Sequence, residues 1–470
     1  MNVFVILADS FRADFLGAYG NDWVKTPNLD DFAEEATLFE EAYSENMPTL
    51  PMRQTAFTGR FGLPFRRWQP LDVKMPVLAE VLWDEGFRTC ITSDTFPMFD
   101  RNREGKFYSR GFESVNWIWG QMDSAAPSQS TEVNIENYIK EDGTSKSDSV
   151  YTELTDYFKN RKNWRDDEDH FVAKVVKESM KLLDRKANDI KGNGGDDLFF
   201  WIDIFDPHEP WDPVAPYDTM YGPLLPGNSK IVHPVARTVE GYLNEREEEH
   251  IRNQYAGLCT IVDKWLGVLF DYLKREGYFD NSLIIFLSDH GEPLGRGKWG
   301  HGIVRKCRPW PYRETAHIPL IIRHPELGKG ERAEGFVQTC DLTATILDYL
   351  QFSPLEGMHG KSLLPLMNGR LEEMRDFAIS GYHKAAWSIR TKDWSYILWR
   401  PEANRNQIPD ESLGAIQCVR GGTLETPGRP ELYNRTQDPY ELNNLVEDRP
   451  NVANRIELKL RRFIESLTWS

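Results

Sequence analysis

Short, continuous apolar runs alternate with amphipathic segments along most of this chain. The expected strands are Val3–Leu7, Phe87–Ser93, Leu198–Phe205, Leu283–Leu287 and His317–Arg323. The expected helices between them include Pro76–Gly86 and Ile251–Glu276. Strands that are apolar on both faces are typical of a parallel sheet covered by helices. The alternation therefore predicts an α/β fold with a large, mixed, mostly parallel sheet sandwiched by helices.

The last hundred residues change character. Short alternating strand candidates at Phe377–Ser380, Ala386–Arg390 and Trp394–Leu398 are followed by a helix from Val452 to Leu467. We therefore expect a large α/β domain at 1–370 and a smaller C-terminal α+β subdomain at 371–470. Within the first, residues from about 120 to 195 are polar and charged, which predicts an insertion over one sheet edge, either a lid or a solvated helical face.

Charge and composition exclude some classes of function. Lys+Arg 56 against Asp+Glu 73 gives a net charge of −17, which argues against a nucleic-acid partner and against an anionic membrane surface. A small anionic substrate remains compatible, because metals and arginines can make one site positive. No stretch approaches the roughly 18 apolar residues of a membrane span, and the first residues do not form a secretion signal. We expect a cytoplasmic protein, and the sequence leaves homo-oligomerisation open.

The cysteines agree with that expectation. The chain has 5 of them, widely spaced and without a CxxC pair: Cys90, Cys259, Cys307, Cys340 and Cys418. Free thiols in a reducing compartment are the expected state.

Four separated segments carry residues suited to chemistry. They are Asp9, Thr49–Arg53, Phe205–Trp211 and Ser288–Glu292, the last followed by His301. Three of these segments directly follow expected strands, and active sites of open α/β sheets form beyond the carboxyl ends of strands. We therefore expect all four to converge.

The residue types in these segments suit a divalent cation. Carboxylates and imidazoles together bind Mn²⁺ or Zn²⁺, with Ca²⁺ or Mg²⁺ as alternatives. Metal coordination would lower the pKa of the Thr49 hydroxyl and make it a nucleophile. Arg53, in a helix expected at Arg53–Gly59, can pair with anionic oxygens, and His208 or His301 can protonate a departing oxygen.

The segment NMPTLPMRQTAFTGR at residues 46–60 resembles the signature of the sulfatases. That signature reads Cys-x-Pro-Ser-Arg, and its cysteine or serine is oxidised to the nucleophile formylglycine. Thr49 stands at this position. Oxidation of its secondary alcohol would give a ketone instead of an aldehyde, so the formylglycine route is closed.

Further motifs extend the resemblance over nearly the whole chain. They lie at residues 2–14, 19–20, 26–30, 205–211, 288–294, 318–323, 431–434 and 438–445. The chain is similar to the sulfatase branch of the alkaline phosphatase superfamily, which implies an alkaline-phosphatase-like fold with residues 1–370 as its catalytic domain. The resemblance implies metal ligands at Asp9, Thr49, Asp289 and His290. It implies catalytic roles for Thr49, Arg53, His208 and His301.

Four positions depart from the sulfatase pattern. Ser10 replaces a second aspartate ligand, Thr49 replaces the formylglycine precursor, His290 replaces a frequent asparagine, and His301 replaces the catalytic lysine. Lys298 is the nearest substitute for that lysine and is expected to bind substrate. Such departures are similar to those of superfamily members that cleave phosphonate monoesters and phosphodiesters. Some of those members bind a second metal, which His208 and His301 with Asp203 or Asp206 could hold here.

Three functions remain open at this point. The first is a metal-dependent hydrolase of phosphate diesters or phosphonate monoesters, with Thr49 as the nucleophile. The second is a sulfatase that uses an unmodified threonine, and the third is a non-catalytic relative that binds an anion. Among the tryptophans, Trp211 and Trp299 adjoin motif histidines, and we expect Trp211 to contact the substrate unless these rings only pack in the core.

Overall fold

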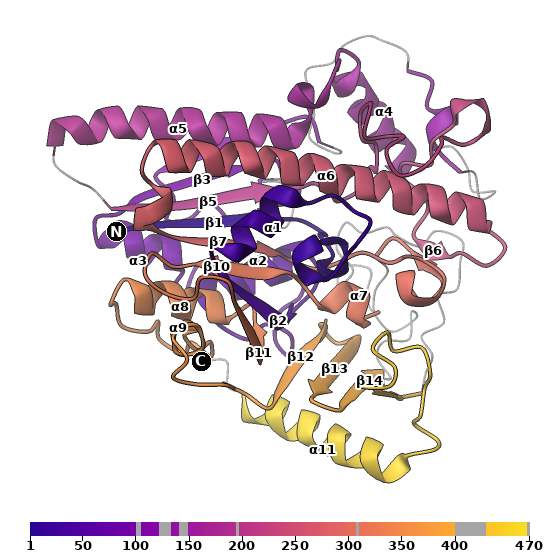
Figure 1. Ribbon diagram of the computed structural model, residues 1–470. Helices are drawn as coiled ribbons and strands as arrows, with labels where there is room; N and C mark the ends of the chain where they lie inside the picture. The colour runs from indigo at the N-terminus through magenta and orange to yellow at the C-terminus, as the bar shows by residue number, and fades with distance from the viewer. Residues whose placement is uncertain are drawn as a thin grey trace.

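A computed structural model describes residues 1–99, 105–121, 133–140, 149–193, 197–306, 310–399 and 429–467, with backbone alone at 149–153 and 186–193. Its centre is an eight-stranded sheet in the order β11-β2-β10-β7-β1-β5-β3-β4 (Figure 1). The strands are β1 (Asn2–Ala8), β2 (Thr37–Tyr43), β3 (Arg88–Ser93), β4 (Ser114–Trp117), β5 (Leu198–Ile204), β7 (Ser282–Ser288), β10 (Leu320–Arg323) and β11 (Glu331–Gln338).

Neighbouring strands of this sheet are parallel except where β10 is involved. β10 runs antiparallel to β7 and to β2, with Ile321 opposite Phe286 and Leu38. The segment between β7 and β10 stays at the carboxyl end of β7. At its end, the Pro319 carbonyl accepts a hydrogen bond from the amide of Ser288, the last residue of β7. β10 therefore enters the sheet from that end and must run in the opposite direction. The mixed, mostly parallel sheet expected from the sequence is confirmed.

Helices cover both faces of the sheet (Figure 1). One face carries α1 (Pro27–Glu34), α5 (Phe171–Asn193) and α6 (Glu245–Arg275), and the other carries α2 (Thr49–Thr58), α3 (Leu78–Asp84) and α8 (Asp341–Tyr349). Alternate side chains of β1 enter the two layers: Phe4 and Ile6 pack into the first, Val3 and Val5 into the second. Each such burial stabilises the fold by about 1.5–3 kcal/mol, which explains why central strands read as continuous apolar runs.

The stretch expected as a polar insertion contains a core helix. α4 (Ser149–Arg161) lies above the sheet, whereas α5 packs along α6 and against β5 and β3. Val172, Val175 and Val176 of α5 are fully buried. α5 is thus part of a covering layer and not a solvated addition, while 122–132, 141–148 and 194–196 of this stretch lie outside the described residues.

The C-terminal part forms a four-stranded antiparallel sheet, as expected. Its strands are β12 (Phe377–Tyr382), β13 (Ala386–Thr391), β14 (Trp394–Trp399) and β15 (Glu431–Asn434). Helix α11 (Pro450–Ser466) packs on it through Ala453, Ile456 and Leu460. The division at residue 370 stays a prediction. The remaining short elements are β6 (Arg237–Thr238), β8 (Leu294–Gly295), β9 (Ile303–Val304), α7 (Arg313–Ala316) and α9 (Leu364–Met367).

Two simpler expectations can be compared with the structure. Cys90, Cys259 and Cys340 are buried free thiols, while Cys307 and Cys418 lie outside the described residues. In the part of the chain that the structure describes, no helix combines the length and apolarity needed to cross a membrane.

A buried carboxylate holds α2 against the loop that follows it. Glu45 accepts hydrogen bonds from the Thr55 hydroxyl at 3.0 Å and from the amides of Gly62 at 3.0 Å and Leu63 at 2.7 Å. Glu45→Ala would leave these donors buried and unpaired, so we expect the free energy of unfolding to fall by about 3 kcal/mol. Urea titration monitored by circular dichroism measures this; a change under 1 kcal/mol would show that water replaces the carboxylate.

Candidate active site

Three neighbouring central strands deliver polar residues to one edge of the sheet. β1 pairs in parallel with β5 on one side and β7 on the other, with Ala8 opposite Ile204 and Ser288. The amide of Asp9 then donates to the Ile204 carbonyl at 2.8 Å. Asp9 therefore lies level with the residues that end β5 and follow β7, and the expected convergence of these strand ends is observed.

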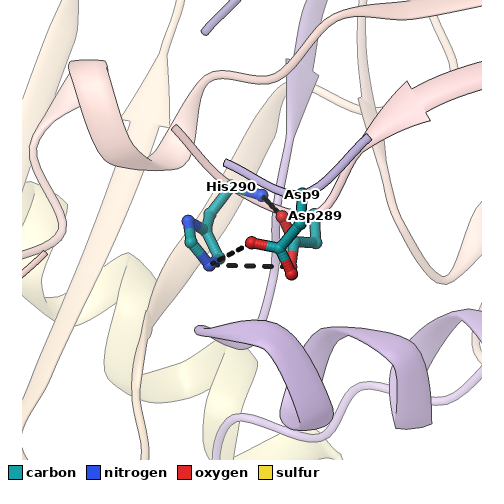
Figure 2. A group of neighbouring side chains, drawn as sticks. All are labelled: Asp9, Asp289 and His290. Atoms are coloured by element: carbon teal, nitrogen blue, oxygen red, sulfur yellow. Dashed lines mark hydrogen bonds and ion pairs between the residues drawn. The ribbon is translucent and has the colours of Figure 1, made fainter. Parts of the chain in front are cut away.

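Asp9, Asp289 and His290 form a fully buried group with the donor atoms of a metal site (Figure 2). We call these three residues the metal-type group. His290 Nε2 lies 3.5 Å from Asp289 Oδ2 and 3.9 Å from Asp9 Oδ1. Burial and the charge of Asp289 raise the pKa of Asp9 well above its usual range. Burial also raises the pKa of Asp289, but His290 and Arg53 outweigh it and hold that pKa low.

The tautomer of His290 fits a cation at this group. Its Nδ1 lies 2.8 Å from the Gly291 carbonyl, so Nδ1 carries the proton and Nε2 presents a lone pair. Burial lowers the pKa of His290 to about 4, which keeps the ring neutral at pH 7. Nε2 is buried and has no hydrogen-bond partner among the described residues. A lone pair aimed at two carboxylates is unfavourable unless a positive ion lies between them, and two carboxylate oxygens with one imidazole suit Mn²⁺ or Zn²⁺.

Ser10 supports this group through an unusual backbone conformation. Its φ is 63°, in the left-handed region that costs a non-glycine residue energy. The conformation lets the Ser10 amide donate to Asp289 Oδ1 at 2.9 Å while its hydroxyl donates to Asp9 Oδ1 at 2.8 Å. Strain held in this way is typical of functional sites. Ser10 therefore orients both carboxylates.

Arg53 lies beneath the carboxylates and uses all five of its N–H donors. It forms a bidentate pair with Asp203, at 2.8 and 2.7 Å, and donates to Asp289 at 2.8 Å and Asp9 at 3.2 Å. The fifth donor reaches the Thr49 carbonyl at 3.1 Å. The guanidinium is fully buried, so these partners offset its desolvation. Arg53 links the segment of Thr49 to the ends of all three central strands.

Thr49 is the first residue of α2, four residues earlier than the helix start expected from the sequence. Pro51 lies in the first turn, where the absent N–H of proline costs no intrahelical hydrogen bond. The unpaired amides and the positive pole of α2 lie at this end of the helix, which favours an anion nearby. Thr49 is 2% exposed and is tied to the metal-type group through Arg53.

His208 and Glu209 follow β5 and are joined to the same network. The His208 ring stacks on Phe205 at 3.9 Å between centroids, and its Nδ1 donates to the Glu209 carbonyl at 2.7 Å. Burial lowers the pKa of His208 to about 3, so the imidazole is neutral. Nε2 has no hydrogen bond to any residue that the structure describes, and it remains available to a ligand.

Lys306 is a site residue that the sequence analysis missed. Its ammonium donates to Ser10 Oγ at 3.1 Å, Glu292 Oε2 at 2.9 Å and Glu209 Oε2 at 3.2 Å. Burial is outweighed by these acids and Asp9, which raise the pKa of Lys306 and keep it charged. The sequence did carry a signal for such a residue: acidic residues outnumber basic ones in the segments after three strands. Buried carboxylates require a cation nearby, so a lysine or arginine was to be expected.

The structure places His301 differently from the sequence expectation. Its Nδ1 contacts Glu314 Oε1 at 2.8 Å, its Nε2 contacts the Glu441 carbonyl at 2.8 Å, and its ring stacks on Tyr312 at 3.8 Å. Both ring nitrogens are thereby occupied, and His301 is not brought to the metal-type group. It instead connects the loop after β7 to the C-terminal subdomain. The alternative second-metal set of His208 and His301 with Asp203 or Asp206 is likewise not assembled, because His301 binds Glu314 and Glu441 and Asp203 pairs with Arg53.

The His301 contacts predict a pH-dependent stability. Burial lowers the pKa of His301, but Glu314 and the Glu441 carbonyl outweigh it and raise the pKa from 6.5 to about 9. The contribution to stability is complete below pH 6.5 and lost as pH rises through 9. We expect His301→Asn, which tolerates the φ of 54°, to be about 2–3 kcal/mol less stable at pH 6 and nearly equal to the parent above pH 9. Urea unfolding at several pH values tests this, and a constant difference would contradict it.

Lys298 and Trp211 form no hydrogen bond or ion pair with Asp9, Asp289 or His290 among the described residues. The Lys298 ammonium packs on the rings of Trp299 at 4.8 Å and Tyr440 at 5.6 Å. Trp211 is fully buried in the core next to Tyr255. A fully enclosed ring has no face for a substrate, so the structure corrects the expected contact of Trp211 to core packing.

Comparison with known proteins agrees with this architecture. The sequence model of the family described as Sulfatase matches residues 1–352, and the one described as N-sulphoglucosamine sulphohydrolase, C-terminal, matches residues 301–411. The chain is 28% identical to the multifunctional alkaline phosphatase superfamily protein PehA of Trinickia caryophylli, over 95% of this chain and 91% of that protein. It is 26% identical to an arylsulfatase of Clostridium perfringens, over 95% and 90%.

Solved structures show the same fold. The phosphonate monoester hydrolase of Agrobacterium radiobacter superposes with a TM-score of 0.73 at 21% identity, covering 99% of this chain and 96% of that one. The enzyme SpPMH from Silicibacter pomeroyi gives 0.70 at 20% identity, covering 99% and 96%. The sheet, its helix layers and the C-terminal antiparallel sheet therefore define an alkaline-phosphatase-like α/β protein. The chain belongs to the sulfatase family of the alkaline phosphatase superfamily, and it is an ester hydrolase.

Proposed function

We propose that this protein is a metal-dependent hydrolase of phosphate diesters or phosphonate monoesters and that Thr49 is its nucleophile. The observation that carries the proposal is the placement of Thr49. By the sequence resemblance it stands at the formylglycine position of the family. In the structure it begins α2, and its carbonyl is bound by the arginine that also holds Asp9 and Asp289. A threonine there supplies an alcohol and excludes the aldehyde chemistry of the formylglycine enzymes.

The residues that would hold the metal are Asp9, Asp289 and His290, together with the Thr49 hydroxyl. A divalent cation at this group supplies Lewis-acid charge neutralisation, which lowers the pKa of a neighbouring hydroxyl. The neutral tautomer of His290 and the unpaired Nε2 support this assignment. Mn²⁺ or Zn²⁺ fits the mixed oxygen and nitrogen donors better than Ca²⁺ or Mg²⁺.

The reaction proceeds by in-line substitution at phosphorus. The Thr49 hydroxyl loses its proton to solvent, and Oγ1 forms a bond to phosphorus while the bond to the leaving oxygen breaks; that oxygen departs as the alcohol after taking a proton from solvent. The oxygen of a water molecule then bonds to phosphorus while the Oγ1–phosphorus bond breaks, which releases the product and returns a proton to Thr49. The positive pole of α2 at Thr49 favours the charge that develops on the phosphoryl oxygens. The Lys306 ammonium, whose donors bind Ser10, Glu209 and Glu292, adds a fixed positive charge to the site. Because His208 is neutral with a free Nε2, it serves better as the acceptor of a proton from water than as a donor in the first step.

A sulfatase with an unmodified threonine is the second candidate function. The match to the family described as Sulfatase and the likeness to an arylsulfatase favour it. A sulfate monoester carries one negative charge, as a phosphate diester and a phosphonate monoester do at pH 7. The site charge alone therefore does not separate these substrates.

Parallel assays separate the two candidates. Purified protein with Mn²⁺ or Zn²⁺ would be assayed with an aryl sulfate, an aryl phosphate diester and an aryl phosphonate that share the same leaving group. We expect kcat/KM for the diester or the phosphonate to exceed that for the sulfate by at least about tenfold, or 1.4 kcal/mol of transition-state stabilisation. A preference for the sulfate would overturn the proposal in favour of the second candidate, and no turnover of any substrate would favour a non-catalytic relative.

A further inference from the structure

A second group of buried carboxylate and imidazole side chains lies beside the active site. Asp94 follows β3, Asp206 follows β5 two residues before His208, and His170 immediately precedes α5. Asp94 is 0%, Asp206 2% and His170 1% exposed. β3 and β5 are neighbours in the sheet, and α5 packs on both of them (Figure 1).

The group contains polar atoms with no hydrogen bond to any described residue. Asp94 uses Oδ1 to accept from the Phe205 amide at 2.8 Å, which leaves Oδ2 without a partner. Asp206 Oδ2 and both ring nitrogens of His170 are also buried without a hydrogen bond. His170 Nδ1 lies 3.2 Å from Asp206 Oδ2, so the imidazole is directed at that carboxylate. Buried polar groups in folded proteins are almost always paired. Apart from this contact, Asp94 Oδ2 and His170 Nε2 have no partner among the described residues, which indicates a ligand.

The charge of the group indicates that this ligand is a cation. Burial and the negative charge of Asp206 raise the pKa of Asp94, so the two carboxylates repel each other. Lys174, one turn into α5, interacts electrostatically with Asp94 and Asp206 but forms no ion pair with either in the described part of the chain. Its ammonium packs on the Trp164 ring at 5.1 Å and the Phe171 ring at 4.6 Å. In the described part of the chain, His170 is the only ion-pair partner of Asp206, and Asp94 has none.

We propose that Asp94, Asp206 and His170 form a second divalent-cation site, distinct from Asp9, Asp289 and His290. Two carboxylate oxygens and one imidazole nitrogen repeat the donor set of the first site and suit Mn²⁺ or Zn²⁺. The first site is additionally neutralised by Arg53, whereas no arginine contacts this second one among the residues described. The ligand atoms of Asp94, Asp206 and His170 do not all lie within 4.8 Å of one another, so an ion bound here would draw the three side chains together.

A cation here would tie three parts of the molecule together. It would join the end of β3, the start of α5 and the loop after β5. That loop carries His208 and Glu209, and Glu209 in turn binds Lys306. The second site therefore positions residues of the active site without contacting the substrate itself.

Metal stoichiometry tests the proposal. The full-length protein would be stripped with a chelator, reconstituted with Mn²⁺, desalted and measured by plasma mass spectrometry, with circular dichroism to verify folding. We expect two ions per chain in the parent, one in His170→Ala and one in Asp289→Asn. His250→Ala removes another buried histidine, 2% exposed, and should retain two ions. Thr49→Ala should also retain at least the ion of the second site, so this count is independent of the proposed nucleophile.

Anomalous diffraction at the manganese edge locates the ions. We expect a peak between Asp94, Asp206 and His170 that persists in Asp289→Asn crystals and disappears in His170→Ala crystals. A single ion per parent chain, or a water molecule without anomalous signal at this group, would overturn the proposal. If His170→Ala fails to fold, the peak in Asp289→Asn alone decides between the two outcomes.

Discussion

Replacing Thr49 by alanine is expected to lower kcat/KM for an aryl phosphate diester or phosphonate by at least about 10³-fold, because the attacking oxygen is removed. Folding should be little affected, since the Thr49 hydroxyl makes no hydrogen bond to any residue that the structure describes and the Thr49 carbonyl still accepts from Arg53. Thr49→Ser keeps a hydroxyl at the same carbon and should retain measurable turnover. Steady-state kinetics on metal-loaded protein provides the measurement.

Thr58→Ala is the matched control for this change. Thr58 lies on the same helix, is buried to the same extent, and donates its hydroxyl to the Gln54 carbonyl at 2.8 Å. Its removal should cost about 1 kcal/mol of stability and leave kcat/KM within a few-fold of the parent. If Thr49→Ala kept the parent's rate constant while both variants were folded, Thr49 would not be the nucleophile.

Arg53→Met is the second change with a large expected effect. It removes the cation shared by Asp203, Asp289 and Asp9, and it leaves three buried carboxylates without their partner. We expect the metal-free protein to lose about 3–5 kcal/mol in the free energy of unfolding and to lose activity in the metal-loaded form. Urea unfolding in the presence of a chelator measures the first effect and steady-state kinetics the second.

Arg390→Met separates stability from catalysis. Arg390 is 1% exposed and pairs with Glu441 in the C-terminal part, and among the described residues it makes no ion pair or hydrogen bond with Asp9, Asp289 or His290. Its removal should destabilise the protein to a similar degree, but the folded fraction should remain active. Equal loss of activity per folded molecule in both variants would contradict the assignment of Arg53 to the site.

The central strands could be predicted from the sequence because burial on both faces leaves an unbroken apolar run. β1, β5 and β7 agree with their predicted ranges to within one residue at each end. β2 and β11 have no such run: β2 carries two partly exposed glutamates, and β11 begins with exposed charged residues and has an irregularity between Ala333 and Phe336. The direction of β10 was not predictable either. It depends on the end of the sheet at which the chain between β7 and β10 lies, and no local pattern gives that.

The strand-end acids were predictable for a related reason. Parallel neighbours bring their carboxyl ends to one edge, so Asp9, Asp289 and His290 had to lie close together. The loop after β7 offered no such constraint. His301 has a φ of 54° and binds Glu441, 140 residues further along the chain, whereas Lys306 turns toward Ser10. Tertiary contacts decide whether His301 or Lys306 lies in the site, and the local sequence does not predict those contacts.

The transition-state analogue vanadate tests the central claim most directly. A crystal structure of the Mn²⁺-loaded protein with vanadate should show vanadium bonded to Thr49 Oγ1, with a leaving oxygen opposite and the metal held by Asp9, Asp289 and His290. That geometry would establish in-line attack by threonine in a sulfatase-family site. Vanadate bound in the site with a water molecule, and not Thr49 Oγ1, at the attacking position would contradict it.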